Sequence, residues 1–402
     1  TDVVAIIGPR QVGKTTLAKA IFEAFQNSEF LDLHDPSCVQ RLGQVSTFLQ
    51  AHDHQLLIID EAQMVPELFP ALRIEMDRRA SETGAERGRV LLHGPAREQR
   101  RDHCRVLTGR ISIIDLGGFH ISELAAQAAA ELPAFSELEL DALDASVPAT
   151  ASAQANIDID RVWNRGGMPK SFLASSDLSS FQWRRDYLDN YVQGELKALG
   201  YDIDLYTFRR VWETVATRCG NLWDFHDCAN GLSVGVSAVR TCVDILIKMG
   251  FVLELRPWFK NIDKRLVRLP KFYIRDTGLM HALLNQNSLQ AVRAAGYDGA
   301  SWEALSIDAI IRSCTVARNF TFYRDRNGAE VDLVIEFSTD KVWAIEIRTD
   351  LDPRPKRGNF TACDVIGAER RILVTRSGPS YSLDSGFEVM SLESICRTLE
   401  SL

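Results

Sequence analysis

The chain has 402 residues, enough for two or three domains, and its composition of 46% hydrophobic and 25% charged residues is that of an ordinary folded protein. Its formal net charge of −8 argues against a protein that coats nucleic acid with its whole surface, although a local basic face remains compatible. No apolar run approaches a membrane span, and the eight cysteines form no Cys-x-x-Cys pair, so we expect reduced thiols in a cytoplasmic protein with no membrane partner.

The first predicted element is an apolar strand over residues 3–7, and we expect the natural chain to carry residues before it. The strand leads into a complete G-x-x-x-x-G-K-[ST] loop. The expected phosphate-binding residues are Gly8, Pro9, Arg10, Gln11, Val12, Gly13, Lys14, Thr15 and Thr16. The glycines let backbone N–H groups turn toward phosphates, Lys14 reaches the β and γ phosphates, and the Thr15 hydroxyl ligates Mg²⁺. A following amphipathic helix points its dipole at the anion. ATP and Mg²⁺ are the predicted cofactors.

A second nucleotide signature is the apolar strand over residues 55–59, which ends in Asp60 and Glu61. Asp60 is expected to hold Mg²⁺, and Glu61 to polarise the attacking water as a catalytic residue beside Lys14. Further strands over residues 89–94 and 111–116 alternate with helices, which predicts an α/β doubly wound parallel sheet of the P-loop NTPase type over residues 1–130.

Arg110 directly precedes the last of these strands. It is a candidate catalytic arginine finger, either near the γ-phosphate of its own chain or in a neighbouring subunit of a homo-oligomer. A structural or solvated arginine fits the sequence equally well.

The middle of the chain changes character. Residues 131–160 contain no Lys or Arg and predict an acidic linker or lid, followed by a helical connector over residues 161–204. Residues 205–285 then show helix, glycine turn, helix and strand, the order of a winged helix-turn-helix.

The region around the predicted wing is basic, with Trp258 and Phe259 interleaved. Its cations are Arg256, Lys260, Lys264, Arg265, Arg268, Lys271 and Arg275. These residues predict contact with DNA phosphates. Internal packing is an equal alternative, because the expected recognition helix carries only Arg240 and Lys248.

Residues 286–402 resemble an α/β restriction-endonuclease-like domain. That fold has the pattern Glu, Asp and Glu-x-Lys, in which the carboxylates hold Mg²⁺. Here Glu303, Asp332 and Glu346 would be the metal ligands, and Arg348 stands in place of the lysine. Because arginine stays protonated, it cannot act as a neutral base. We therefore favour a degenerate nuclease fold, with its carboxylates paired to Arg324 or Arg326.

As a set, these motifs resemble a prokaryotic AAA-type ATPase family whose C-terminal domain is of uncharacterised function. The resemblance is carried by the phosphate loop, Asp60-Glu61-Ala62-Gln63, Leu107-Thr108-Gly109-Arg110, Ser122-Glu123-Leu124, Gly166-Gly167-Met168-Pro169, Tyr273-Ile274-Arg275-Asp276-Thr277-Gly278-Leu279 and Gly328-Ala329-Glu330-Val331-Asp332. It implies ATP binding and hydrolysis. The family has a small hydroxyl residue after the glycine of the third strand as a γ-phosphate sensor, whereas this chain has Pro95. Sensing would then fall to His93 or Arg97, and slow hydrolysis is compatible.

The sequence therefore predicts a Mg²⁺-dependent ATPase whose nucleotide state controls a winged-helix and nuclease-like C-terminal half that acts on DNA. Two alternatives stay open. An ATP-gated DNA nuclease requires the three C-terminal carboxylates to share one metal ion. An ATP-binding regulator or defence component would show slow or no turnover.

Overall fold

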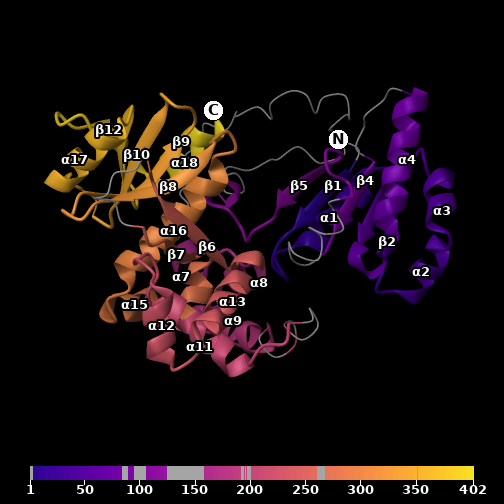
Figure 1. The fold of residues 1–402 in the computed structure, drawn as a ribbon, viewed down its shortest axis with the longest axis horizontal. Coiled ribbons are helices and arrows are strands. Elements are labelled where there is room, and N and C mark those ends of the chain that lie inside the picture. The colour runs from indigo at the N-terminus through magenta and orange to yellow at the C-terminus, as the bar shows by residue number, and fades with distance from the viewer. Residues whose placement is uncertain are drawn as a thin grey trace. The chain divides into compact units, whose positions relative to one another are not determined.

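A computed structural model describes residues 3–83, 89–94, 106–124, 158–191, 194, 196, 201–259, 268–350 and 352–402. The chain divides into two compact units (Figure 1). The first is built mainly on Thr1–Gly118, and the second takes in Phe119–Ala128, Ala155–Ile247 and Phe251–Leu402. Most of the predicted acidic linker, together with Pro95 and Arg97, lies outside the described residues.

The first unit contains a five-stranded parallel sheet in the order β2-β3-β4-β1-β5. Its strands are β1 (Val3–Ile7), β2 (Ser28–Asp32), β3 (Leu56–Asp60), β4 (Val90–His93) and β5 (Ile111–Asp115). Its helices are α1 (Lys14–Ala24), α2 (Pro36–Leu42), α3 (Val45–Ala51) and α4 (Leu68–Thr83), with a 3-10 turn η1 (Ala62–Met64). Parallel neighbours need crossover connections, which these helices supply.

Both faces of this sheet are covered by apolar side chains. Ala18 of α1 packs in one core cluster with Ile58 and Leu91, whereas Ile59 and Leu92 join the larger cluster on the other face with α3 and α4. Adjacent strand residues thus point to opposite cores, as the period of two in a strand requires. The prediction of a doubly wound parallel sheet is confirmed, and the first unit has the P-loop NTPase fold.

The second unit contains a mixed eight-stranded sheet in the order β12-β13-β11-β10-β9-β8-β6-β7. Its strands are β6 (Val252–Pro257), β7 (Lys271–Ile274), β8 (Asn319–Arg324), β9 (Glu330–Glu336), β10 (Val342–Ile347), β11 (Arg370–Thr375), β12 (Tyr381–Ser382) and β13 (Glu388–Ser391). β6 pairs antiparallel with β7 and parallel with β8. The hairpin expected as a wing therefore belongs to the same sheet as the C-terminal strands.

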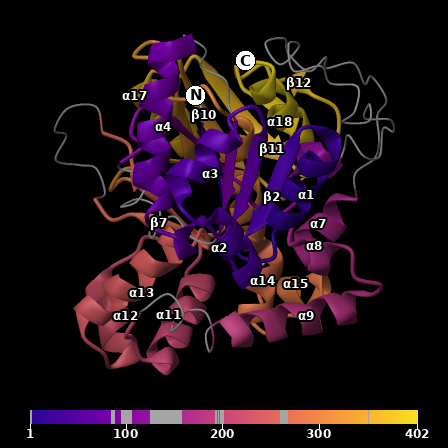
Figure 2. The ribbon, with the colours of Figure 1, turned by 90° about the vertical axis from the view of Figure 1, so that its right-hand side faces the viewer.

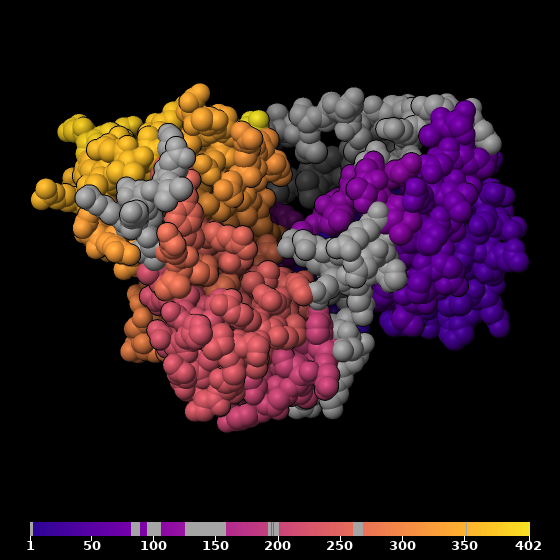
Figure 3. All heavy atoms as spheres, viewed as in Figure 1, coloured from indigo at the N-terminus to yellow at the C-terminus, as the bar shows by residue number. Residues whose placement is uncertain are grey.

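Helices surround this sheet. They are α7 (Ile159–Arg165), α8 (Pro169–Phe172), α9 (Asp177–Asn190), α11 (Leu205–Thr217), α12 (Phe225–Leu232), α13 (Val236–Lys248), α14 (Thr277–Leu283), α15 (Leu289–Ala294), α16 (Asp298–Ser313), α17 (Arg357–Ile366) and α18 (Leu392–Glu400). α11, α12 and α13 lie side by side (Figure 2), and Figure 3 shows this region as one packed body. α12 and α13 meet at 109°, an angle found in helix-turn-helix units.

Within the described part of the chain, no single helix is long and apolar enough to cross a membrane; the bent pair α12 and α13 would together have the required length and composition.

Two glycine-containing segments of the second unit, residues 165–168 and 276–279, pack against each other, and we call this contact the joint. The Asp276 carboxylate accepts hydrogen bonds from the backbone N–H groups of Gly167 (2.8 Å), Met168 (3.2 Å) and Leu279 (2.8 Å). A Cβ atom on Gly278 would collide with the Arg165 backbone. The motifs around Gly166 and Asp276 therefore hold the helices of this unit together.

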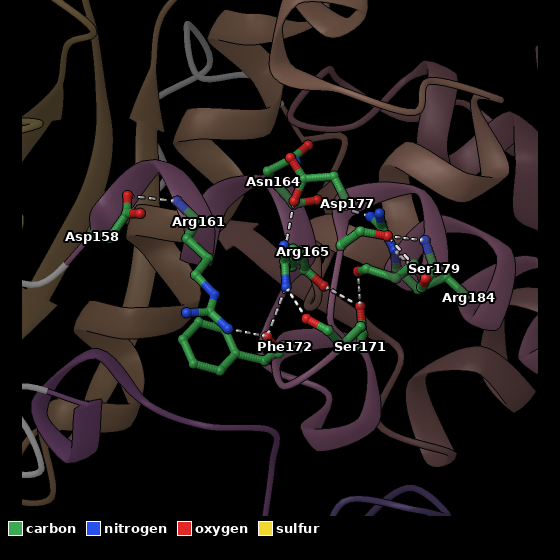
Figure 4. A network of polar contacts seen from close by, with 12 residues as sticks. Asp158, Arg161, Asn164, Arg165, Ser171, Phe172, Asp177, Ser179 and Arg184 are labelled. Atoms are coloured by element: carbon green, nitrogen blue, oxygen red, sulfur yellow. Dashed lines mark hydrogen bonds and ion pairs between the residues drawn. The ribbon is translucent and has the colours of Figure 1, made fainter.

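Arg184 of α9 adds hydrogen bonds to this joint (Figure 4). Its fully buried guanidinium donates to the carbonyl oxygens of Asn164 (2.8 Å), Gly278 (2.8 Å) and Ser180 (3.2 Å). Burial lowers the pKa of Arg184 to about 10, which leaves it charged at neutral pH. Nearby, Arg165 donates to Asp177 at 2.6 Å.

We expect Gly278→Ala to destabilise the protein by about 1–3 kcal/mol, because the added methyl group meets backbone atoms that cannot move aside. Gly299→Ala in α16 is the matched control. Its methyl group would meet open space, so it should be neutral or slightly stabilising. Urea unfolding followed by tryptophan fluorescence measures both. Equal stability of the two variants would contradict the structural role of the joint.

Candidate functional site

The phosphate loop joins β1 to α1 at the carboxyl edge of the first sheet. The backbone takes positive φ at Gly8 (157°), Gln11 (64°) and Gly13 (102°), a pattern that turns N–H groups inward to form an anion-binding nest. A Cβ atom on Gly8 would collide with the carbonyl oxygen of Leu116, so only glycine fits there. α1 begins at Lys14, directly after Gly13, and its N-terminus faces the loop.

The Lys14 ammonium lies within this loop. Its Nζ donates to the carbonyl oxygens of Gly8 (3.0 Å) and Pro9 (2.7 Å), and the residue is only 8% exposed. The positive charge is thus held beside the inward-turned backbone, as a phosphate site requires.

Asp60 lies beneath the loop, at the carboxyl end of β3. Its Oδ2 accepts a hydrogen bond from the Thr15 hydroxyl at 3.3 Å, and its Oδ1 lies 2.8 Å from Nδ1 of His93. Asp60 and His93 are cross-strand neighbours on β3 and β4 and are both buried. The structure therefore brings together the two predicted Mg²⁺-binding residues. The contact between His93 and Asp60 was not predicted, although the end position of His93 on its strand pointed to this edge.

Glu61 follows in a left-handed conformation, with φ of 54°. Its N–H donates to the His93 carbonyl oxygen at 2.9 Å. Its carboxylate accepts a hydrogen bond from the Gln63 amide and lies 3.8 Å from Nε2 of His34. Sequence reasoning missed Gln63 and His34 as partners. Gln63 lies two residues along the same motif, whereas only the alignment of β2 beside β3 reveals His34.

Arg110 requires a correction. It directly precedes β5, which runs parallel to β1, so it lies at the amino edge of the sheet, whereas the phosphate loop leaves the carboxyl edge. Its side chain forms an ion pair with Asp77 of α4. Arg110 is therefore not near the γ-phosphate position of its own chain. A role in a neighbouring subunit stays a prediction.

The C-terminal carboxylates form a separate buried cluster in the second unit. Lys271 of β7 is 2% exposed, and its Nζ lies 2.9 Å from Glu330 Oε1 and 3.5 Å from Glu303 Oε1. Tyr273 donates to Glu303 at 2.6 Å. The Lys271 ammonium and the Tyr273 hydroxyl are thus the polar partners of Glu303.

The other two carboxylates of the cluster have their own partners. Asp332 accepts the N–H of Ile347 at 2.8 Å, and Glu346 pairs with Arg348 at 2.6 Å. Among the residues that the structure describes, no three His, Cys, Asp or Glu residues are placed to hold a metal ion. The expectation that Glu303, Asp332 and Glu346 form a Mg²⁺ site is therefore not met. The cationic partners of Glu303 and Glu346 are Lys271 and Arg348 rather than Arg324 or Arg326, and Arg324 instead pairs with Glu330 at 3.4 Å.

Burial controls the charge of this cluster. Burial, followed by the nearby Asp332 charge, raises the pKa of Glu346 to about 9, although Arg348 opposes the shift. The same two causes raise the pKa of Glu303 to about 7 against the opposing charge of Lys271. In the absence of a bound cation, burial therefore favours the protonated form of Glu346.

The predicted basic surface of the wing is smaller than expected. Lys271 is buried, Arg275 pairs with Asp308 at 2.7 Å, and Arg256 pairs with Glu254 at 3.1 Å. Trp258 is buried, whereas Phe259 is 54% exposed and Arg268 is exposed. Lys260, Lys264 and Arg265 lie outside the described residues.

Comparison with known proteins divides the chain into three regions. Residues 1–125 match the model of an AAA domain, residues 156–290 match a domain of unknown function (DUF8612), and residues 298–395 match a second domain of unknown function (DUF4143).

Two relatives match over most of the chain. They are uncharacterized proteins Rv2008c of Mycobacterium tuberculosis and Mb2031c of Mycobacterium bovis, each 32% identical over 362 residues, which is 90% of this chain and 73% of theirs. Among solved structures, the Walker-type ATPase PABY2304 of Pyrococcus abyssi aligns with a TM-score of 0.41 at 13% identity, over 70% of this chain and 91% of that one.

Glu346→Gln tests the buried cluster through pH. The folded pKa of about 9 exceeds the ordinary value of 4.5, so Glu346 stabilises the fold fully below pH 4.5, and this contribution is lost as the pH rises to 9. The amide mimics the protonated acid. At pH 9 the variant should be more stable than the parent by at least about 1 kcal/mol, with a flatter stability profile.

Urea unfolding midpoints from pH 5 to 9 provide the measurement. The exposed Glu369→Gln serves as control and should leave the profile unchanged. A Glu346→Gln profile parallel to that of the parent would show that Glu346 is ionised in the folded state.

Proposed function

We propose that this chain, which belongs to the same family as the two mycobacterial proteins and carries its AAA domain, is a Mg²⁺-dependent ATPase whose nucleotide state controls the second unit. The AAA match and the parallel sheet of the first unit support ATP binding by a P-loop ATPase. The proposal is supported mainly by one contact: at the end of the phosphate loop, the Thr15 hydroxyl donates a hydrogen bond to the Asp60 carboxylate at 3.3 Å.

The residues at this edge fit a nucleotide with its metal ion. Backbone N–H groups of the loop and the N-terminus of α1 would bind the phosphates, and Lys14 would neutralise their charge. Thr15 and Asp60 would hold Mg²⁺, because hydroxyl and carboxylate oxygens are the ligand types it prefers. Bound Mg²⁺ supplies charge neutralisation for phosphoryl transfer. Glu61 orients the attacking water, and Gln63 fixes its carboxylate.

A short connection supports control of the second unit. Leu116, whose carbonyl oxygen lies against Gly8 of the phosphate loop, is followed by Gly117 and Gly118. Phe119 then donates its N–H to the Gly167 carbonyl oxygen (2.7 Å), within the joint that holds the second unit. Gly117 and Gly118 are thus suited to act as a hinge, at which a displacement of the phosphate loop would change the orientation of the second unit.

Contact with DNA is a second proposal, favoured by one surface of the second unit. A groove of about 600 Å³ lies beside β6 and β8, adjoins another of about 430 Å³, and shares Trp258 and Phe259 with it. Arg268 and Arg318 line these grooves and have no ion-pair partner among the described residues. Exposed aromatic and arginine side chains together suit a nucleic-acid strand.

The acidic groups in these grooves have partners. Glu254 pairs with Arg256, and Glu336 keeps its charge while it accepts hydrogen bonds from Trp258 (3.0 Å) and Asn319 (3.1 Å). The arginines that line the grooves outnumber the two glutamates, so the net charge there is positive, which favours a phosphate backbone. The ATP-gated nuclease has no such support, because the C-terminal carboxylates do not gather around one ion.

Lys14→Ala should abolish binding of a fluorescent ATP analogue, because it removes the charge that neutralises the phosphates. Glu61→Gln should keep binding within about threefold but slow phosphate release by about 10²-fold or more, since it removes only the group that acts on water. Lys19→Ala on the exposed part of α1 is the control. Unchanged ATP turnover in Lys14→Ala would refute the assignment. Tight binding with negligible release in the parent would favour the regulator alternative.

Fluorescence anisotropy with labelled single-stranded and duplex DNA tests the second proposal. The double variant Phe259→Ala, Arg318→Glu should weaken binding by about tenfold or more, since a stacked base contributes about 1–3 kcal/mol. Arg354→Glu, an exposed arginine outside both grooves, should have a small effect. Equal affinity of the two variants would place any DNA contact elsewhere.

A further inference from the structure

We infer that His93 is a positioning residue for Asp60, and that its imidazole holds one carboxylate oxygen so that the other stays with Thr15. This inference rests on the proposed nucleotide function and adds a residue to its metal-binding machinery.

The register of the sheet creates the contact. β4 lies between β1, which leads into the phosphate loop, and β3, which ends at Asp60. Because Asp60 and His93 are paired residues on neighbouring parallel strands, both side chains leave the sheet at its carboxyl edge. Nδ1 of His93 lies 2.8 Å from Oδ1 of Asp60, while Oδ2 faces Thr15 at 3.3 Å. The two carboxylate oxygens therefore have different partners.

The short distance fixes where the imidazole proton lies. The 2.8 Å contact lacks the angle of a hydrogen bond in this structure, so it is a close polar contact. Two lone pairs at this distance would repel, which places a hydrogen on Nδ1, the nitrogen that faces the carboxylate. Nε2 has no hydrogen-bond partner and no comparable polar neighbour among the described residues.

Because His93 is buried, its positioning role does not involve direct contact with a nucleotide. The His93 side chain is 1% exposed, and the Phe30 ring lies 6.3 Å away between ring centroids. Asp60 is itself 6% exposed. The polar group within reach of Nδ1 is the Asp60 carboxylate, so His93 acts through Asp60 rather than on the phosphates. His93 would thus orient a carboxylate that binds the metal ion, without contacting the ion itself.

The tautomer can be measured without metal or nucleotide. Nitrogen-15 NMR of the histidine side chains in the metal-free full chain, with His93 assigned from the signal missing in His93→Asn, should show the Nδ1–H form. The commoner Nε2–H form at His93 would overturn the inference.

Metal dependence provides the second readout. His93→Leu removes the donor, whereas His93→Asn places an amide N–H near the Nδ1 position. Binding of a fluorescent ATP analogue should require about 10–100-fold more Mg²⁺ in His93→Leu and stay near the parent in His93→Asn. Leu92→Ala is the control, because this neighbour is equally buried and its loss should lower stability without shifting the Mg²⁺ requirement.

An unchanged Mg²⁺ requirement in His93→Leu, or an equal shift in Leu92→Ala, would overturn the positioning role. Failure of the parent chain to bind the analogue would refute the proposed function instead, and the tautomer measurement would still decide the contact between His93 and Asp60. If His93→Leu fails to fold, the Mg²⁺ requirement of His93→Asn and the NMR measurement of the His93 tautomer still test the inference.

Discussion

The nucleotide site depends on one buried carboxylate that needs a polar partner for each of its oxygens. Asp60 is only 6% exposed, and a buried polar group is costly unless it has partners. The Thr15 hydroxyl of α1 donates to one carboxylate oxygen, and Nδ1 of His93 of β4 lies 2.8 Å from the other. The sheet order that places β4 between β1 and β3 is what lets a residue of β4 reach this carboxylate. The fit of Gly8 against Leu116 then anchors the phosphate loop to the chain that leaves β5.

The buried carboxylates of the second unit also have polar partners, of two different kinds. Asp276 is satisfied by three backbone N–H groups, and this ties the segment around Gly167 to the start of α14. The cluster around Glu303 instead relies on the Lys271 ammonium and on the pairing of Arg348 with Glu346, while burial raises the pKa of Glu346. Lys271 belongs to the β6–β7 hairpin, so the cation that neutralises the cluster also ties the hairpin to the C-terminal strands.

The phosphate loop, Asp60 and the parallel sheet were predictable, because each follows from a short sequence pattern. The contact of Thr15 with Asp60 followed from knowing that parallel strands end at one edge. The position of Arg110 was not predictable, since a residue before a strand gives no sign of which edge the site occupies. Neither was the burial of Lys271, which reads as an exposed wing residue until β6 is seen to pair with β8. The family resemblance identified the Gly166 and Asp276 motifs but not their mutual packing.

We propose that Thr15, Asp60 and His93 form a single magnesium-binding unit at the phosphate loop. Electron paramagnetic resonance of Mn²⁺ added with a non-hydrolysable ATP analogue tests this proposal, because it follows the bound ion and its coupling to phosphorus. We expect one bound Mn²⁺ per chain, with phosphorus coupling, that is lost in Asp60→Ala. Mn²⁺ that binds without phosphorus coupling, or that persists in Asp60→Ala, would contradict it.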